Sequence, residues 1–442
     1  YTLHSGLSFT YNNNHIPAPE GRVNKTAQYT EKNFNTYINL KNEDDKRKVS
    51  INPGLYFIYK DGASFSTSID QSGFSLMSGK RNSYLELRYV EKMISVPVHL
   101  LFKPASFLDI TSLVTLTYND FNPLSQSDYV AIGDWHSKEV NAQGALDVKL
   151  NFGPFGFSAG GSVKGIYAKT DGGFDYRSYR KIDPSDTIIS IHAFSSGLNY
   201  RPVENILLYC NGGMYSNAPT LRERYGSKGG VAPNPDLKPE TGYTGDIGCK
   251  LKFKSIYADI AGFYNRSKNT IILHHNSFES KPLNTEGAIV YGSEMDVNWD
   301  ISKYINIQAK STVQKTKNLS NGKRLPNEPA VSIIGKFITR PLKGVTLNYW
   351  ADFKSVYYRD PANTSSFRVP VLSSTNAINF GQLFHNINIE WVPQKNISLS
   401  FSARNLTRDN LSFDEAPHPM EGEYSWILYP TNTWAVTGSY SF

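Results

Sequence analysis

Apolar and polar residues alternate along many short stretches of this chain. In the segment "NINIEW", Ile387, Ile389 and Trp391 fall on one face, and polar residues occupy the positions between them. Successive side chains of a β-strand point to opposite faces, so this alternation predicts a strand with one apolar and one polar face. The same pattern recurs at 94–102, 294–300, 305–310, 345–354 and 397–404. The chain is therefore predicted to be all-β.

The segments that connect these strands alternate between short and long. Eight short connections are expected at 42–46, 103–106, 153–156, 201–205, 253–255, 300–303, 341–344 and 393–396. Nine long ones are expected near 13–26, 61–82, 121–135, 171–185, 218–237, 268–283, 317–326, 359–379 and 410–427. Short turns at one end and long loops at the other predict an antiparallel meander of about 18 strands. The one helical exception is "TLRERYG", where Thr220 and Glu223 fit a capping box before Gly226.

An open meander of this size would leave unpaired backbone groups on its two edge strands. About 18 strands would curl or split as one open sheet, and closure into a barrel removes the edges. The interior of so wide a barrel is too large for side chains to fill, so the polar face meets water and the apolar face meets lipid. The fold class is thus an antiparallel transmembrane β-barrel of outer-membrane type. A soluble sandwich or propeller also alternates, but neither explains the alternating loop lengths, and blade-length repeats are missing.

The last residues, "WAVTGSYSF", carry apolar side chains on one face and end on an aromatic ring. The residues concerned are Trp434, Val436, Tyr440 and Phe442. The segment resembles the C-terminal signal of bacterial outer-membrane proteins, which the barrel-assembly machinery reads. That resemblance implies a periplasmic C-terminus, periplasmic short turns and external long loops. An ordinary edge strand that ends in Phe is the alternative.

The stretch from 215 to 253 resembles the TonB-dependent outer-membrane receptors. Their pattern joins an "xLxExYG" turn to an "NPxLKPE" segment that leads into the next strand. The matching residues are Pro219, Leu221, Glu223, Tyr225, Gly226, Asn234, Pro235, Leu237, Lys238, Pro239 and Glu240. The later segment from Asn284 to Glu294 is similar to the family's next paired strand, and 12–33 resembles receptors of the cobalamin and siderophore group. Because Pro235 and Pro239 favour an extended chain, the motif is expected to be scaffold and not a ligand site.

The family resemblance implies a 22-stranded barrel around an N-terminal plug. Residues 1–442 look like strands five to 22 of that barrel, a single domain without the plug and the first strands. The implied function is energised uptake of a scarce nutrient complex, of the ferric siderophore, haem or cobalamin class, across the bacterial outer membrane. TonB would act through the plug, and lipid with lipopolysaccharide would surround the barrel. A plugless 18-stranded passive porin is the alternative, and a structural or adhesive barrel is a third.

Aromatic residues and arginines recur in the expected external loops. Aromatic faces and guanidinium groups suit a large ligand that is partly aromatic and partly anionic. The candidates are Tyr129, Trp135, Tyr176, Arg177, Tyr179, Arg180, Tyr357, Tyr358, Arg359, Phe367, Arg368 and Trp426. For each one, a place in the interfacial aromatic girdle or a contact with lipopolysaccharide is the alternative interpretation.

Composition and motifs exclude several other classes of protein. The net charge is +7, but lysines and arginines are spread out, which argues against nucleic-acid binding. No run of 18 apolar residues predicts a transmembrane helix. Nucleophile-elbow, zinc-protease and P-loop motifs are missing from the sequence, so neither an enzyme nor a cofactor is expected.

Two further pairs of residues have side chains that can bind metal or form a disulfide. His274 and His275, with Glu279 nearby, would point to opposite sides of an extended chain, so no metal site is expected. Cys210 and Cys249 are expected on the outward face of the two strands that flank the motif loop. Two unpaired small residues are favoured there, and a disulfide is the alternative.

Overall fold

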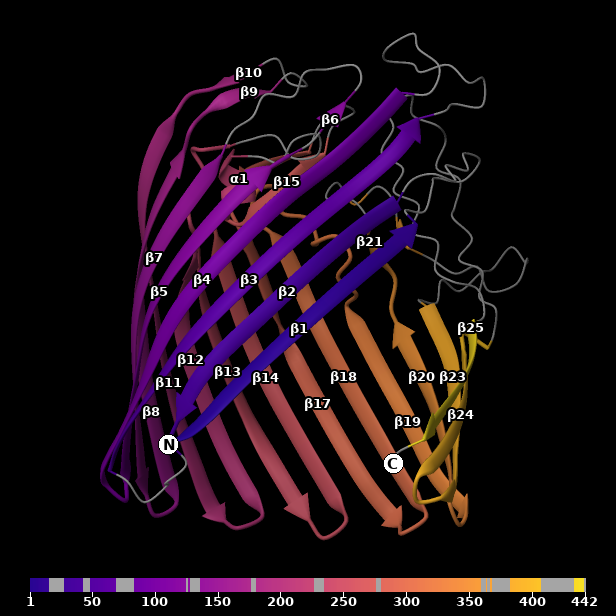
Figure 1. Ribbon diagram of the computed structural model, residues 1–442. Helices are drawn as coiled ribbons and strands as arrows, with labels where there is room; N and C mark the ends of the chain where they lie inside the picture. Colours follow the sequence, from indigo (N-terminus) through magenta and orange to yellow (C-terminus); the bar gives the residue numbers. More distant parts are fainter. Residues whose placement is uncertain are drawn as a thin grey trace.

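The computed structural model describes residues 1–15, 28–42, 48–68, 83–124, 126–127, 136–175, 180–225, 234–275, 280–358, 363, 366–367, 382–406 and 433–440. Its main sheet contains 19 strands, of which β6 has two residues. The other 18 form a curved wall around a central lumen (Figure 1). Among the described residues, no helix is long and apolar enough to cross a membrane.

The strands of the wall follow chain order. They are β1 (Thr2–His15), β2 (Gln28–Lys41), β3 (Val49–Ser68), β4 (Ser83–Ala105), β5 (Leu108–Pro123), β7 (Ser137–Phe152), β8 (Phe155–Thr170), β11 (Ser185–Val203), β12 (Ile206–Asn217), β13 (Glu240–Phe253), β14 (Ile256–Lys268), β17 (Ala288–Ser302), β18 (Ile305–Asn318), β19 (Val331–Leu342), β20 (Val345–Lys354), β23 (Gln382–Gln394), β24 (Ile397–Arg404) and β25 (Thr433–Tyr440). The two-residue β6 (Gln126–Ser127) pairs with β4 outside this order. The long connections hold α1 (Leu221–Tyr225) and three small hairpins: β9 (Gly173–Asp175) with β10 (Arg180–Ile182), β15 (Ile271–His275) with β16 (Ser280–Asn284), and β21 (Tyr357–Tyr358) with β22 (Ser366–Phe367).

Each long strand pairs antiparallel with the next one along the chain. The predicted meander, its strand number and its alternating connections are confirmed. The wall strands differ in length: β3 has 20 residues and β4 has 23, whereas β24 and β25 have eight each. Closure is the exception: the pairings of the described residues include none between β1 and β25, so these two strands form the edges of the wall. A closed 18-stranded porin would require that pairing.

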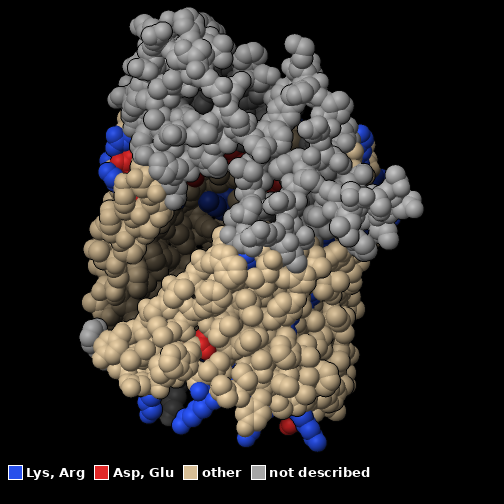
Figure 2. Space-filling model, turned by 90° about the vertical axis from the view of Figure 1, so that its right-hand side faces the viewer, with Lys and Arg blue, Asp and Glu red and all other residues tan. Residues whose placement is uncertain are grey.

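The apolar face of the wall points outward, as the alternation predicts. On the outer face, Val114, Leu116 and Val163 are 53%, 55% and 59% exposed. Facing the lumen, Asn141, Asn306 and Asn386 are buried. Figure 2 shows an outer surface that is nearly free of charged side chains between its upper and lower edges. This uncharged band fits the hydrocarbon layer of a membrane.

The last strand presents its apolar side chains on the same outer face. Trp434, Val436 and Tyr440 are 60%, 79% and 58% exposed. Trp434 also packs on Phe401 of β24, with 5.6 Å between the ring centroids. Phe442 lies outside the described residues.

A matched pair of substitutions tests which face meets lipid. Val163 points outward in the middle of β8, and its neighbour Ser162 points into the lumen. Val163→Arg is expected to lower the free energy of unfolding by about 2–4 kcal/mol, the cost of arginine near the bilayer midplane. Ser162→Arg should leave it nearly unchanged. Urea unfolding in lipid vesicles measures both, and a larger loss for Ser162→Arg would mean that the assigned faces are reversed.

Candidate functional site

The family motif begins with the short helix α1, whose first turn closes a capping box. The Thr220 backbone N–H donates to Glu223 Oε2 at 2.8 Å, and the Glu223 N–H donates to Thr220 Oγ1 at 3.3 Å. The two side chains thus satisfy backbone groups that a helix start leaves free. This is the capping box that the sequence predicts.

Helix α1 packs against the lumen side of the wall. Leu221 and Tyr225, which are 5% and 0% exposed, form an apolar cluster with Phe121 of β5 and Ala168 of β8. Helix α1, in the connection between β12 and β13, therefore covers part of the lumen side of the wall at the end that carries the long connections (Figure 1).

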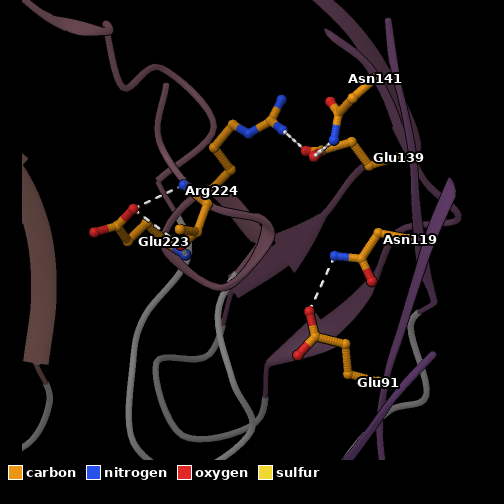
Figure 3. Close-up of polar contacts among 7 residues, drawn as sticks. Glu91, Asn119, Glu139, Asn141, Glu223 and Arg224 are labelled. Atoms are coloured by element: carbon orange, nitrogen blue, oxygen red, sulfur yellow. Dashed lines mark hydrogen bonds and ion pairs between the residues drawn. The ribbon is translucent and has the colours of Figure 1, made fainter. Parts of the chain in front are cut away.

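An ion pair fixes this docked helix. Arg224 is fully buried, and its Nη2 donates to Glu139 Oε2 on β7 at 2.8 Å (Figure 3). Glu139 also accepts a hydrogen bond from Asn141 at 2.7 Å. Nε and Nη1 of Arg224 have no hydrogen-bond partner within the described part of the chain. Glu139 is thus the counter-charge of a guanidinium that cannot reach water.

The "NPDLKPE" segment is held by two asparagines. Asn234 Nδ2 donates to the Pro282 carbonyl at 2.8 Å. Asn284 accepts from the Lys238 N–H at 2.8 Å and donates to the carbonyls of Lys238, at 2.9 Å, and Asn269, at 2.8 Å. Leu237, the only apolar residue between the two prolines, is 5% exposed. Asn284 therefore joins three separate segments through backbone groups.

A second external contact involves one of the predicted aromatic residues. The Arg324 guanidinium lies 5.9 Å from the ring centroid of Tyr358, a cation–π arrangement. The Asn327 N–H donates to the Tyr358 carbonyl at 2.6 Å, and the Arg324 N–H donates to Asn363 Oδ1 at 2.9 Å. Tyr357 is 7% exposed. These contacts tie the β18–β19 connection to the β20–β23 connection.

The lumen wall contains a cavity of about 410 Å³ on strands β12 to β19, lined by both polar and apolar residues. Tyr209 donates to Asp259 Oδ1 at 2.9 Å, and Lys250 lies 3.2 Å from the same carboxylate. Lys310 pairs with Asp296 at 2.8 Å. The sequence pattern placed 294–300 and 305–310 on strands with polar faces, but it did not single out these residues as a group.

Most predicted ligand residues lie outside the described residues: Tyr129, Trp135, Tyr176, Arg177, Tyr179, Arg359, Arg368 and Trp426, together with Gly226 of the motif. Arg180 is in β10 and Phe367 is in β22, and only their backbone positions are described. Among the predicted ligand residues, Tyr357 and Tyr358 have described side chains. Arg324, which lies beside Tyr358, was not among the residues predicted from the sequence.

The two cysteines and the two adjacent histidines form no site in the described part of the chain. Cys210 and Cys249 are both free, as favoured. They face outward on adjacent strands but are offset, since Cys210 lies opposite Ile247 and Cys249 opposite Leu208. His274 and His275 are in β15, and Glu279 lies outside the described residues. The described residues contain no group of three or more His, Cys, Asp or Glu that could hold a metal ion.

Comparison with known families adds to this geometry. A family profile described as "TonB dependent receptor-like, beta-barrel" matches residues 1–406. The chain belongs to the TonB-dependent receptor family. The match covers most of the sequence and agrees with the resemblance carried by the motif. A search of curated protein sequences finds no match.

Solved structures share the fold at low sequence identity. The copper transporter OprC superposes with a TM-score of 0.74 at 12% identity, covering 94% of this chain and 66% of that one. The ferric citrate transporter FecA gives 0.70 at 14%, with coverages of 95% and 62%. The ferric yersiniabactin uptake receptor FyuA from Yersinia pestis gives 0.64 at 11%, with coverages of 86% and 57%. The chain therefore spans less than two thirds of the length of these structures.

Membership of this family fixes two general properties of the TonB-dependent receptor barrel. It is an outer-membrane protein, and it belongs to a transport family and not to a class of enzymes. The outward apolar band and the polar lumen agree with that location.

Proposed function

We propose that this barrel serves energised uptake of a scarce nutrient complex of the ferric siderophore, haem or cobalamin class. The observation that carries the proposal is the 18-strand wall with a polar lumen, in a chain of this family. Similar solved structures are described as transporters or receptors of copper, ferric citrate and ferric yersiniabactin. Ligand capture by external loops and passage through the lumen would need no covalent chemistry.

We assign ligand contact to the long connections. Tyr358 and Arg324 support this choice, because an aromatic ring and a guanidinium lie together at that end of the barrel. Such a pair suits a ligand with aromatic and anionic groups. Tyr357 is buried, so we assign the contact to Tyr358. The other predicted aromatic residues and arginines remain part of the proposal. The motif itself is proposed to be scaffold, since its polar contacts are internal.

The partners belong to the proposal as well. TonB would supply energy through a plug inside the barrel, and the polar wall around Asp259 and Asp296 offers hydrogen-bonding groups to such a plug. We also propose that the segment ending at Phe442 is the signal for the barrel-assembly machinery. Phe442→Ser is expected to lower the amount of protein inserted into the outer membrane several-fold, and normal insertion would rule out the signal. Outer-membrane lipid and lipopolysaccharide would surround the barrel.

Ligand binding and transport are tested with the full-length protein. Tryptophan quenching is measured with ferric siderophores, haem and cyanocobalamin, and uptake is measured in cells with and without TonB. Quenching by one of these compounds is expected, with uptake that stops without TonB. Arg324→Ala with Tyr358→Ala should weaken binding about tenfold, because it removes the aromatic and cationic groups proposed to contact the ligand. Lys323→Ala is the nearby control. TonB-independent diffusion of small sugars, with no response to any of the compounds, would favour the passive porin instead.

A further inference from the structure

Four neighbouring hairpins place a lysine at the same position of their turns. The two-residue turns that join β13 to β14, β17 to β18, β19 to β20 and β23 to β24 begin with Lys254, Lys303, Lys343 and Lys395. We call these four residues the lysine rim. All four are exposed, and Figure 2 shows basic side chains along the lower edge of this face. Because adjacent strands lie about 4.8 Å apart, successive rim lysines are on the order of 10 Å apart.

The four turns that form the lysine rim carry positive charge and no negative charge. No acidic residue occurs within two positions of any of the four turns, and Lys252 adds a further positive charge. The two-residue turns at 106–107 and 204–205 differ, because Asp109 and Glu204 lie at or beside them and neither turn contains lysine. Lys254 even has φ of +40°, a backbone region that favours glycine or asparagine over lysine. The four rim turns thus form a basic arc, while exposed Lys48 and Arg201 lie at other hairpins of the same end and Asp300 is the acidic residue nearest to Lys303 in the sequence.

Exposed aromatic residues lie directly above the rim on the outer face. Phe253, Trp299 and Trp391 are 47%, 43% and 48% exposed, and Tyr304 follows Lys303 in its turn. The Lys303 ammonium lies 4.8 Å from the Tyr304 ring centroid. Aromatic residues gather where a barrel leaves the hydrocarbon layer, so the lysines just beyond them lie at the level of the lipid headgroups.

We propose that the lysine rim binds the phosphate headgroups of anionic phospholipids in the periplasmic leaflet. Ammonium groups on flexible stems reach such phosphates easily, and anionic surfaces attract clustered lysines. An acidic protein surface would match the charge too, but the adjoining aromatic band favours lipid as the occupant. The proposal rests on the orientation that the C-terminal resemblance implies, with short turns facing the periplasm. It does not depend on which nutrient is carried.

The test uses Trp299 and Trp391 as local reporters. Full-length protein is placed in phosphatidylcholine vesicles, and brominated phosphatidylglycerol or brominated phosphatidylcholine is added as the quencher. Subtracting the signal of a Trp299→Phe, Trp391→Phe variant isolates the two reporters. Stronger quenching by the anionic lipid is expected, and raising the salt from 0.1 to 1 M should weaken it because the screening length falls from about 10 to 3 Å.

Three variants decide the outcome. Replacing all four rim lysines with glutamine should lower the preference for phosphatidylglycerol at least fivefold, since each lysine near an anionic surface contributes roughly that factor. Replacing them with arginine should preserve the preference. The matched control converts four exposed lysines at the opposite end, Lys138, Lys169, Lys315 and Lys317, to glutamine and should change nothing at these reporters.

An unchanged preference in the glutamine rim variant would overturn the proposal and leave an acidic protein as the occupant. An equal loss in the control variant would overturn it too, since the attraction would then follow net charge. Failure of the nutrient uptake test would leave this measurement intact, because lipid quenching requires no transported ligand. If the glutamine variant does not insert, the arginine variant and the salt series still test the proposal, and equal quenching by both lipids in the unmodified protein contradicts it.

Discussion

Glu139→Leu is expected to lower the free energy of unfolding by about 3–5 kcal/mol, because it leaves the Arg224 guanidinium buried without a counter-charge. The Arg224 side chain is fully buried, and that of Glu139 is 12% exposed. The substitution also removes the acceptor for Asn141. Urea unfolding of the refolded protein, followed by tryptophan fluorescence, measures the loss.

Two further variants show whether the lost stability comes from leaving a charge buried or from losing any ion pair. Lys310 and Asp296 are also 2.8 Å apart, but their side chains are 63% and 40% exposed. Exposed ion pairs contribute little, so Lys310→Gln should cause a much smaller loss. Replacing both members of the buried pair, as Glu139→Leu with Arg224→Met, should recover much of the stability because no charge is then left buried. Equal losses for Glu139→Leu and Lys310→Gln would mean that α1 is not anchored by this pair.

Asn284→Ala is expected to release the "NPDLKPE" segment. Its side chain makes three hydrogen bonds to the backbone of Lys238 and Asn269, each contributing about 1 kcal/mol. The loss of roughly 3 kcal/mol corresponds to about a hundredfold faster exchange of the Lys238 amide hydrogen. Hydrogen exchange followed by mass spectrometry of the peptide covering 234–240 measures it.

Lys238→Ala is the matched control, because Asn284 contacts only backbone atoms of Lys238. Amide exchange in that variant should match the unmodified protein. Should Asn284→Ala leave exchange unchanged, or should Lys238→Ala accelerate it as strongly, the scaffold role proposed for the motif would be wrong. A fall in ligand affinity upon Lys238→Ala with normal exchange would instead indicate a direct ligand contact.

Local patterns predicted most of the wall. Alternation at 94–102 or 397–404 fixes a strand and its two faces because neighbouring side chains of a strand must point in opposite directions. Thr220 and Glu223 are three residues apart, so their capping box could be predicted from spacing alone. The cysteine faces followed from the same parity, although their exact offset required the register between β12 and β13.

The contacts that anchor the external end depend on residues far apart in the chain. Arg224 lies between two motif residues, but its partner Glu139 is 85 positions earlier on a strand that is not adjacent to α1 in sequence. Asn284 meets Lys238 across 46 positions, and Arg324 meets Tyr358 only because two long connections pack together. No periodicity in the sequence encodes such pairings.

The sequence by itself determined the strands, the turns, the direction of each face and the family, because these depend on spacing over a few residues and on a motif of fixed order. Tertiary structure alone decided which distant groups share the lumen and how α1 docks. Those features arise when the curvature and register of the sheet bring distant residues together, and register is set by the pairing of whole strands.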